Sequence, residues 1–199
     1  MNLFTQMPRK FAMVGTIMFC LLLVACGSSN TGSTSGTPTT GGNNGKGCKK
    51  VGVLLPETAT SARWDSKDRP LLQQDIPQVL SGATVDYTNA QGNADLQQTQ
   101  AQADLTKGDC ILVVAPSDSI KSAAIVSAAQ AKGVPVIAYD RLIYSNTLNY
   151  YVSFNNVQVG NLQGTYVAQH YQSYVSANGT KNTVMIDGSQ TDNNALLFN

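Results

Sequence analysis

A series of short apolar runs, separated by longer segments with helical spacing, constrains the fold of this chain more than any other feature. Each run is nearly continuous in apolar residues, which is typical of strands buried on both faces, as in a parallel sheet covered by helices. The alternation therefore predicts right-handed βαβ units, and hence an α/β fold with a doubly wound parallel sheet. The runs fall at residues 51–55, 85–87, 111–115, 134–139 and 150–154.

The segments between the first four runs carry helix start and stop signals. Asn93 can cap a helix that begins near Ala94, and Gly108 stands just past its expected end. Ser117 or Asp118 can cap the next helix. These signals agree with the helical crossovers that a parallel sheet requires.

Other parts of the pattern are less regular. Pro77 lies in the first crossover, where it should kink or end the helix. After the last run we expect a long helix over residues 157–175, a strand over residues 183–186 and a further helix opened by Asp192.

The first 25 residues have the pattern of an export signal. Arg9 and Lys10 precede an apolar stretch over residues 11–25, which is shorter than the roughly 20 residues of a spanning helix. The stretch runs into Leu-Val-Ala-Cys at residues 23–26, which resembles a bacterial lipobox. That resemblance implies cleavage before Cys26 and a diacylglyceryl group on its sulfur. A plain secretory signal is the alternative.

Two of the four cysteines remain for the folded region, because Cys20 lies in the signal and Cys26 would carry lipid. An exported protein reaches a compartment that permits disulfides. In a sheet with the strand order 2-1-3, the strands that follow Cys48 and Cys110 are parallel neighbours. Adjacent strand ends lie close enough for a bridge. We therefore predict a Cys48–Cys110 disulfide, with two reduced thiols as the alternative.

Charge and motif content argue against several classes of function. The formal net charge is +1 and no basic stripe follows Lys10, which argues against nucleic-acid binding. His170 is the single histidine and stands in no catalytic motif, and no Cys or His spacing suggests a metal. We therefore expect neither an enzyme nor a bound metal or cofactor.

Polar clusters follow the predicted strands at the edge where doubly wound sheets bind ligands, beyond the carboxyl ends of the strands. Carboxylates accept hydroxyl protons, guanidinium groups donate in a fixed fork and amides do both, so such clusters suit a sugar. An indole ring can lie against the C–H face of a pyranose. Ordinary loop polarity is the alternative for each cluster. The candidate ligand-binding residues are Arg63, Trp64, Asp140, Arg141, Asp192 and Asn194.

The sequence around these clusters resembles a known family. Residues 134–143, Val-Pro-Val-Ile-Ala-Tyr-Asp-Arg-Leu-Ile, look like the hinge-proximal signature of periplasmic xylose-binding proteins. The same group is matched, over a region from about Val51 to Phe198, by Arg63-Trp64 and by residues 89–93, 151–156, 159–163 and 192–195. The chain thus resembles the type I periplasmic sugar-binding proteins, in particular the D-xylose-binding components of ABC transporters.

This resemblance implies two α/β lobes that close around a sugar. Arg63, Asp140 and Arg141 would hydrogen-bond its hydroxyls from the first lobe, and Asp192 and Asn194 from the second. The chain then divides into a signal over residues 1–25, a flexible Gly/Ser/Thr-rich tether over 26–47, an N-terminal lobe over 48–154 and the start of a C-terminal lobe over 155–199. Because that second lobe has barely begun, we expect the sequence to be a fragment or a truncated reading frame.

The resemblance also implies a function and a location. The expected protein is a monomer, anchored by lipid outside the cytoplasm. It would deliver a monosaccharide, D-xylose or a related aldose, to the permease of an ABC importer. A receptor that presents its bound sugar to a membrane signalling protein is the alternative.

Overall fold

A computed structural model of the chain describes residues 47–175, 182 and 184–198. The chain divides into two units, Met1–Pro38 and Thr39–Asn199, and every described residue belongs to the second unit. The expected export signal, the lipidation site Cys26 and the tether up to residue 46 lie outside the described residues.

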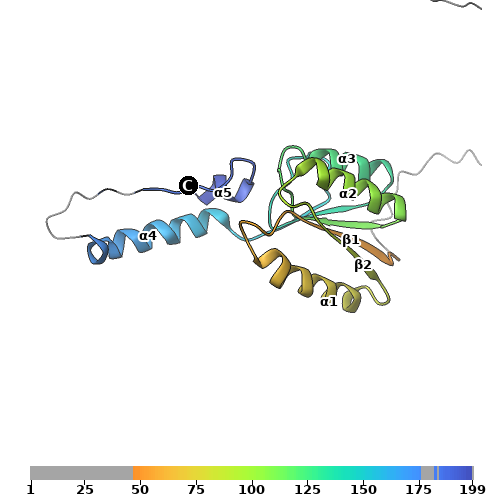
Figure 1. Ribbon diagram of the computed structural model, residues 1–199, viewed down its shortest axis with the longest axis horizontal. Helices are drawn as coiled ribbons and strands as arrows, with labels where there is room; N and C mark the ends of the chain where they lie inside the picture. The colour runs from red at the N-terminus through yellow and green to blue at the C-terminus, as the bar shows by residue number, and fades with distance from the viewer. Residues whose placement is uncertain (1–46, 176–181, 183, 199) are drawn as a thin grey trace, which may run out of the picture. The chain divides into compact units, whose positions relative to one another are not determined.

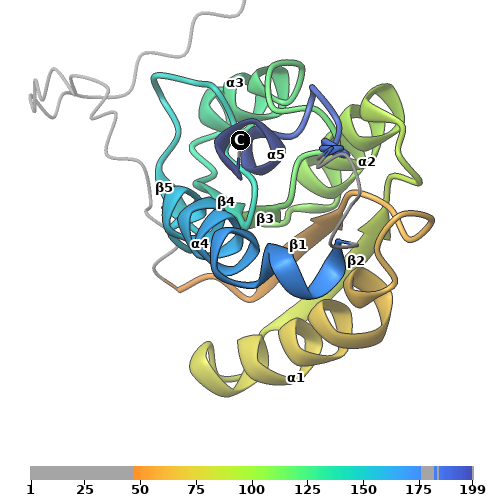
Figure 2. The same ribbon diagram turned by 90° about the vertical axis from the view of Figure 1, so that its left-hand side faces the viewer.

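A parallel sheet forms the centre of the described region. Its strands are β1 (Lys50–Leu55), β2 (Thr84–Asn89), β3 (Ile111–Val114), β4 (Val136–Tyr139) and β5 (Tyr150–Val152). They lie in the order β2-β1-β3-β4-β5, all parallel, as Figure 2 shows. The expected 2-1-3 order is therefore confirmed. In register, Val51 lies opposite Val85 of β2 and Ile111 of β3.

Helices cover both faces of this sheet. Figure 1 shows α1 (Arg69–Val79) on one face, and α2 (Ala94–Lys107) with α3 (Ala123–Ala131) on the other. A short π-helix, η1 (Trp64–Asp68), leads into α1. After β5 come α4 (Asn156–Tyr174) and α5 (Asn193–Phe198). The arrangement confirms the doubly wound α/β fold expected from the alternation of strands and helices.

The hydrophobic core lies in two layers because alternate residues of each strand face opposite sides of the sheet. The layers meet η1 and α1 on one side and α2 and α3 on the other. The first layer contains Val51, Val53, Leu55, Trp64 and Val113. The second contains Leu54, Leu112, Val114, Ile125, Val126 and Val136.

The helix signals act as expected for α2 and differ in detail for α3. Asn93 accepts hydrogen bonds from the backbone N–H groups of Asp95 and Leu96, at 2.9 and 3.0 Å. Gly108 ends α2 with a φ of 90°, in the left-handed region that favours glycine. Asp118 caps a turn that precedes α3, so α3 begins only at Ala123.

Two expectations for regular structure were wrong. Pro77 lies inside α1, which continues to Val79. It stands in the last turn, where only two residues follow and the lost hydrogen bond disturbs little of the helix. Residues 184–186 of the expected strand are not a strand, and residue 183 lies outside the described residues. None of the strands in the described region pairs with residues 184–186, and Ile186 is 94% exposed.

Cys48 and Cys110 are joined by a disulfide in the structure, with their Cα atoms 5.5 Å apart. Cys48 precedes β1 and Cys110 precedes β3, so the bond links neighbouring strands at their amino ends. This edge of the sheet is opposite the one at which ligands are expected to bind.

Helix α4 keeps much of its apolar surface exposed, and Asn156 is the one buried residue within its bounds. Over the described ranges, no helix is both long and apolar enough to cross a membrane. The large apolar side chains exposed on α4 are Val157, Leu162, Tyr166, Val167 and Tyr174.

Candidate functional site

A cavity of about 300 Å³ lies where the carboxyl ends of β1, β4 and β5 meet the beginning and end of α5. This volume is at the small end of the range of ligand pockets, about 300–1,000 Å³. The structure brings all six candidate residues together in its lining, together with three that sequence reasoning missed. The lining consists of Ser61, Arg63, Trp64, Asp140, Arg141, Phe154, Asp192, Asn194 and Phe198.

Asp140 is held in an unusual backbone conformation directly after β4. Its φ is 65°, which is uncommon for any residue with a side chain. The N–H of Arg141 donates to the carbonyl of Tyr139 at 2.8 Å, which closes a tight γ-type turn around Asp140. The hydroxyl of Ser153 donates to the Asp140 carbonyl at 2.6 Å and holds the turn in place. Strained backbone of this kind is concentrated at functional sites.

The carboxylate of Asp140 is buried and receives donors from two distant segments. Arg63 donates a short hydrogen bond to Oδ2 from the loop after β1. Asn194 of α5 donates to Oδ1 at 2.7 Å. Burial raises the pKa of Asp140, and the positive charge of Arg63 opposes this increase.

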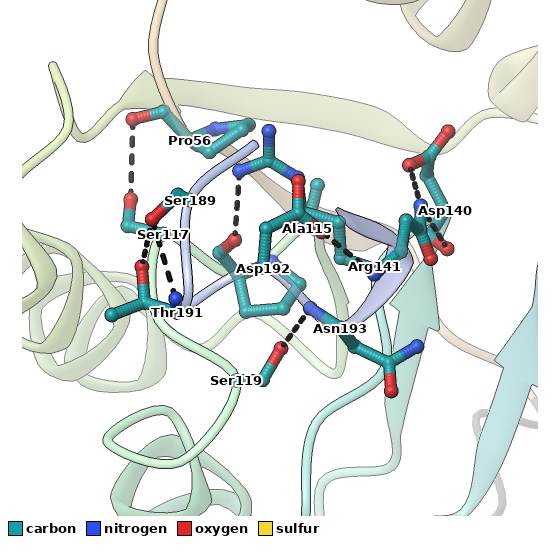
Figure 3. Close-up of polar contacts among 12 residues, drawn as sticks. Pro56, Ala115, Ser117, Ser119, Asp140, Arg141, Ser189, Thr191, Asp192 and Asn193 are labelled. Carbon is teal, nitrogen blue, oxygen red and sulfur yellow. Dashed lines mark hydrogen bonds and ion pairs between the residues drawn. The ribbon is translucent and has the colours of Figure 1, made fainter. Parts of the chain in front are cut away.

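Arg141 forms the second charged pair of the cavity. Its Nε atom lies 2.9 Å from Oδ2 of Asp192, as Figure 3 shows. A longer hydrogen bond of 3.4 Å runs from Nη1 to the carbonyl of Pro116, in the loop after β3. Arg141 thereby connects the ends of three segments: β4, the loop after β3 and the turn that begins α5.

Asp68, which sequence reasoning did not select, supports the cavity from η1. It is buried, and Tyr139 donates to its Oδ1 at 2.6 Å. The same oxygen lies 3.7 Å from Nη1 of Arg63. Burial, together with the hydrogen bond to Asp68, raises the pKa of Tyr139. Arg63 therefore lies between two carboxylates, and its guanidinium group is held in one orientation.

The structure changes the role expected of Trp64. We expected the indole to lie against a pyranose, but its ring is only 1% exposed and belongs to the core. The guanidinium groups of Arg63 and Arg141 lie 4.1 and 5.3 Å from the ring centroid. Trp64 therefore supports the two arginines through cation–π contacts instead of offering a free face to a ligand.

Phe154 and Phe198 provide the aromatic surface of the cavity. Their rings stack with centroids 6.2 Å apart, and Phe154 is 48% exposed. The apolar position of Phe154 at the end of a strand was visible in the sequence. Its contact with Phe198 was not, because the two residues are 44 positions apart in the sequence.

Contacts with the main sheet region anchor the segment that carries Asp192 and Asn194. The hydroxyl of Tyr144 donates to Oδ1 of Asn193 at 2.7 Å. Ser119 lies at the centre of this contact, because its N–H donates to the carbonyl of Thr191. Its hydroxyl accepts from the N–H of Asn193 (Figure 3). Gly160 allows α4 and α5 to approach, since a Cβ there would collide with the carbonyl of Phe198.

Two polar atoms of residues that line the cavity lack a partner. Asn194 Oδ1 and Trp64 Nε1 are buried and take part in no hydrogen bond. A buried polar atom without a partner costs about 1–3 kcal/mol.

Residues 56–199 match the profile of a family described as periplasmic binding protein domain. The chain belongs to this family. It is 34% identical over 149 residues to the multiple sugar-binding periplasmic protein SbpA of Azospirillum brasilense, covering 74% of this chain and 40% of that protein. It is 33% identical over 149 residues to the D-xylose-binding periplasmic protein of Haemophilus influenzae, covering 75% and 42%. The chain thus spans about two fifths of the length of these relatives.

Solved structures of solute-binding proteins agree with the fold. An ABC transporter solute-binding protein from Clostridium phytofermentans with bound β-D-glucose matches with a TM-score of 0.67 and 32% identity, covering 75% of this chain and 45% of that chain. A carbohydrate transporter solute-binding protein from Chloroflexus aurantiacus, in complex with D-glucose, gives 0.63 and 35%, covering 74% and 41%. The fold is that of the type I periplasmic binding proteins.

Proposed function

We propose that this chain forms part of an extracytoplasmic solute-binding protein that captures a monosaccharide for an ABC importer. The observation that carries the proposal is the composition of the cavity. Two arginines and two aspartates line it, so their formal charges cancel and both hydrogen-bond donors and acceptors are present. Such a lining suits an uncharged ligand with many hydroxyl groups. The exposed ring of Phe154 suits the C–H face of a sugar.

An aldose such as D-xylose or D-glucose is the ligand that we propose. Relatives at 33% and 31% identity are named D-xylose-binding periplasmic proteins, and D-glucose is bound in two of the similar structures. A carboxylate at Asp140 and guanidinium groups at Arg63 and Arg141 provide acceptors and donors for vicinal hydroxyls.

A lipid anchor at Cys26 is a further part of the proposal. It rests on the apolar stretch over residues 11–25 and on the Leu-Val-Ala-Cys sequence in which the stretch ends. An anchored receptor stays near its permease, and the Gly/Ser/Thr-rich tether would let the folded region move above the membrane.

Calorimetric titration of the full-length protein tests the function. We expect heat of binding with one or more of D-xylose, D-glucose, D-ribose, L-arabinose and D-galactose. Asp140→Ala should weaken that binding at least about tenfold, because it removes the buried partner of Arg63 and Asn194. The melting temperature without sugar should fall as well, because Arg63 and Asn194 lose a buried partner, so affinities are compared at a temperature at which both proteins are folded.

Asp75→Ala is the matched control, because Asp75 is exposed on α1 and does not line the cavity. It should bind sugar with the affinity of the wild-type protein. Equal affinities for the wild-type protein and Asp140→Ala would place the sugar elsewhere. Absence of binding to every sugar of the panel would contradict the proposed function.

A further inference from the structure

Three aspartates lie close together at a place that the sugar site does not use. Asp86 is on β2, Asp104 is in the last turn of α2, and Asp109 is in the connection from α2 to β3. One carboxylate oxygen from each lies within 4.8 Å of the others. The side chains of Asp104 and Asp109 have no exposed surface, and that of Asp86 is 32% exposed. We call these residues the acidic cluster.

Gly52 of β1 makes room for this cluster. A Cβ at this position would lie 2.7 Å from Cδ2 of Leu112 and 3.1 Å from Oδ2 of both Asp104 and Asp109. The two carboxylates therefore approach the strand at a residue without a side chain. A larger residue would collide with Leu112 and crowd both carboxylates.

Three oxygen atoms of the acidic cluster are buried and accept no hydrogen bond: Oδ2 of Asp104 and both carboxylate oxygens of Asp109. Two lysines at the rim balance part of the charge. Lys107 donates to Oδ1 of Asp104 at 3.1 Å, while Lys50 reaches Asp109 only at 3.7 Å and donates instead to the carbonyl of Lys107. Three negative charges thus face two positive charges on side chains that are about half exposed.

Holding the three carboxylates together in the ionised form costs free energy unless a counter-ion lies closer to them than Lys50 and Lys107 do. Burial, together with repulsion from Asp86 and Asp104, raises the pKa of Asp109 to about 6. Burial also raises the pKa of Asp104, although the hydrogen bond from Lys107 opposes the increase. A buried carboxylate whose oxygens lack partners requires a proton or a cation.

We propose that Asp86, Asp104 and Asp109 bind a divalent cation, with Ca²⁺ as the preferred ion. Ca²⁺ takes oxygen ligands at about 2.3–2.6 Å, so oxygens on opposite sides of one ion are about 5 Å apart and neighbouring ones are closer. The spacing of the acidic cluster fits this range. Cys110 is in the disulfide and no histidine is close, so the donors are all oxygens, which suits Ca²⁺ better than Zn²⁺.

The lysines set the expected strength of binding. Lys50 and Lys107 are exposed enough to turn toward solvent when a cation enters through the open side at Asp86. Their charges still repel the ion, so the dissociation constant should lie in the range of weak extracellular sites, about 0.1–1 mM. Lys107→Gln removes one of these charges and should tighten the binding of Ca²⁺ at least about threefold.

The test uses the full-length protein after EDTA treatment, titrated with CaCl₂ near pH 7.5 in a calorimeter and melted with and without CaCl₂. We expect saturable binding of one Ca²⁺ per chain and a higher melting temperature. Asp109→Asn should abolish both effects, whereas Asp75→Asn, on the exposed side of α1, should preserve them. Because protons compete with the cation for the carboxylates, the effect of Ca²⁺ should weaken in acid.

Two outcomes would overturn the proposal. One is the absence of saturable Ca²⁺ binding to both the wild-type protein and Lys107→Gln. The other is equal Ca²⁺ binding by the wild-type protein and Asp109→Asn. The proposal does not depend on sugar binding, which should be unchanged in Asp109→Asn, so failure of one proposal is distinguishable from failure of the other.

Discussion

Asp140 combines a positive φ, a buried carboxylate and contacts with three segments of the chain. Each of the first two features costs free energy, and the hydrogen bonds from Arg63, Asn194 and Ser153 offset that cost. An aspartate tolerates the left-handed region better than most residues, which explains its presence at this turn. The result is a carboxylate fixed in direction before any ligand arrives.

The raised pKa of Asp140 predicts how sugar binding depends on pH. Burial favours the neutral acid, which donates one hydrogen bond and no longer attracts Arg63. Sugar affinity should therefore be constant near neutral pH and fall on acidification, starting at a higher pH than for an exposed aspartate. The affinity of Asp140→Asn should be low and should vary much less over the same range.

Titration calorimetry at a series of pH values measures the sugar affinity of the wild-type protein and of Asp140→Asn. Asp75→Asn is the control, and its affinity should depend on pH as that of the wild-type protein does. A wild-type affinity that is constant down to the pKa of an ordinary exposed carboxyl group would contradict the prediction.

Single elements of the fold position these groups. The π-helix η1 turns Trp64 and Asp68 into the core while Arg63, just before it, reaches the cavity. A π-turn is rare and is often found at functional sites. Helix α5 has only six residues, yet it brings Asn194 and Phe198 to the same cavity. Such a short helix can position these side chains because hydrogen bonds from neighbouring segments hold it in place, such as the one from Tyr144 to Asn193.

The Cys48–Cys110 disulfide links two elements of the fold, because it joins the amino ends of β1 and β3, and its cysteines are 62 positions apart in the sequence. Cys110→Ser should lower the free energy of unfolding by about 2–4 kcal/mol, since the open loop gains entropy in the unfolded chain. Reduction of the wild-type protein should have a similar effect, and sugar affinity should be unchanged. Denaturant unfolding with and without reductant measures the difference. Equal stabilities would show that the two thiols are not bridged in the exported protein.

At the scale of the whole molecule, the two proposed sites use different ends of one sheet. The cavity lies at the carboxyl ends of the strands, while the acidic cluster lies between Gly52 in β1, Asp86 in β2 and the segment before β3. They share no residue, so the increases in melting temperature caused by sugar and by Ca²⁺ should be nearly additive.

The proposed membrane attachment is also a property of the whole chain. In a bacterial host, Cys26→Ser should prevent the incorporation of labelled palmitate, because it removes the sulfur that would carry the lipid. The mutant precursor should remain uncleaved or be found away from the membrane fraction. Cys20→Ser is the matched control and should label normally, since Cys20 precedes the expected cleavage site. Labelling of Cys26→Ser at the wild-type level would contradict the lipid assignment.

The sequence by itself determined the fold class and the order of the first three strands, and with the family resemblance it also indicated the six residues that gather at the cavity. Local patterns carry much of this: apolar runs mark the strands, Asn93 and Gly108 mark the ends of α2, and Asp140 and Arg141 directly follow a strand at the ligand edge. Each of these signals depends only on residues that are close together in the sequence, so it can be recognised before any distant contact is known.

Only the tertiary structure decided what the distant residues do together. It buried Trp64 beneath two arginines, stacked Phe154 on Phe198, placed Asp68 behind Arg63 and left residues 184–186 without a partner strand. It also brought Asp86, Asp104 and Asp109 over Gly52. Each of these outcomes depends on which faces of separate elements come into contact. Burial, charge pairing and pKa depend on that contact, so they cannot be read from residue type and spacing along the chain.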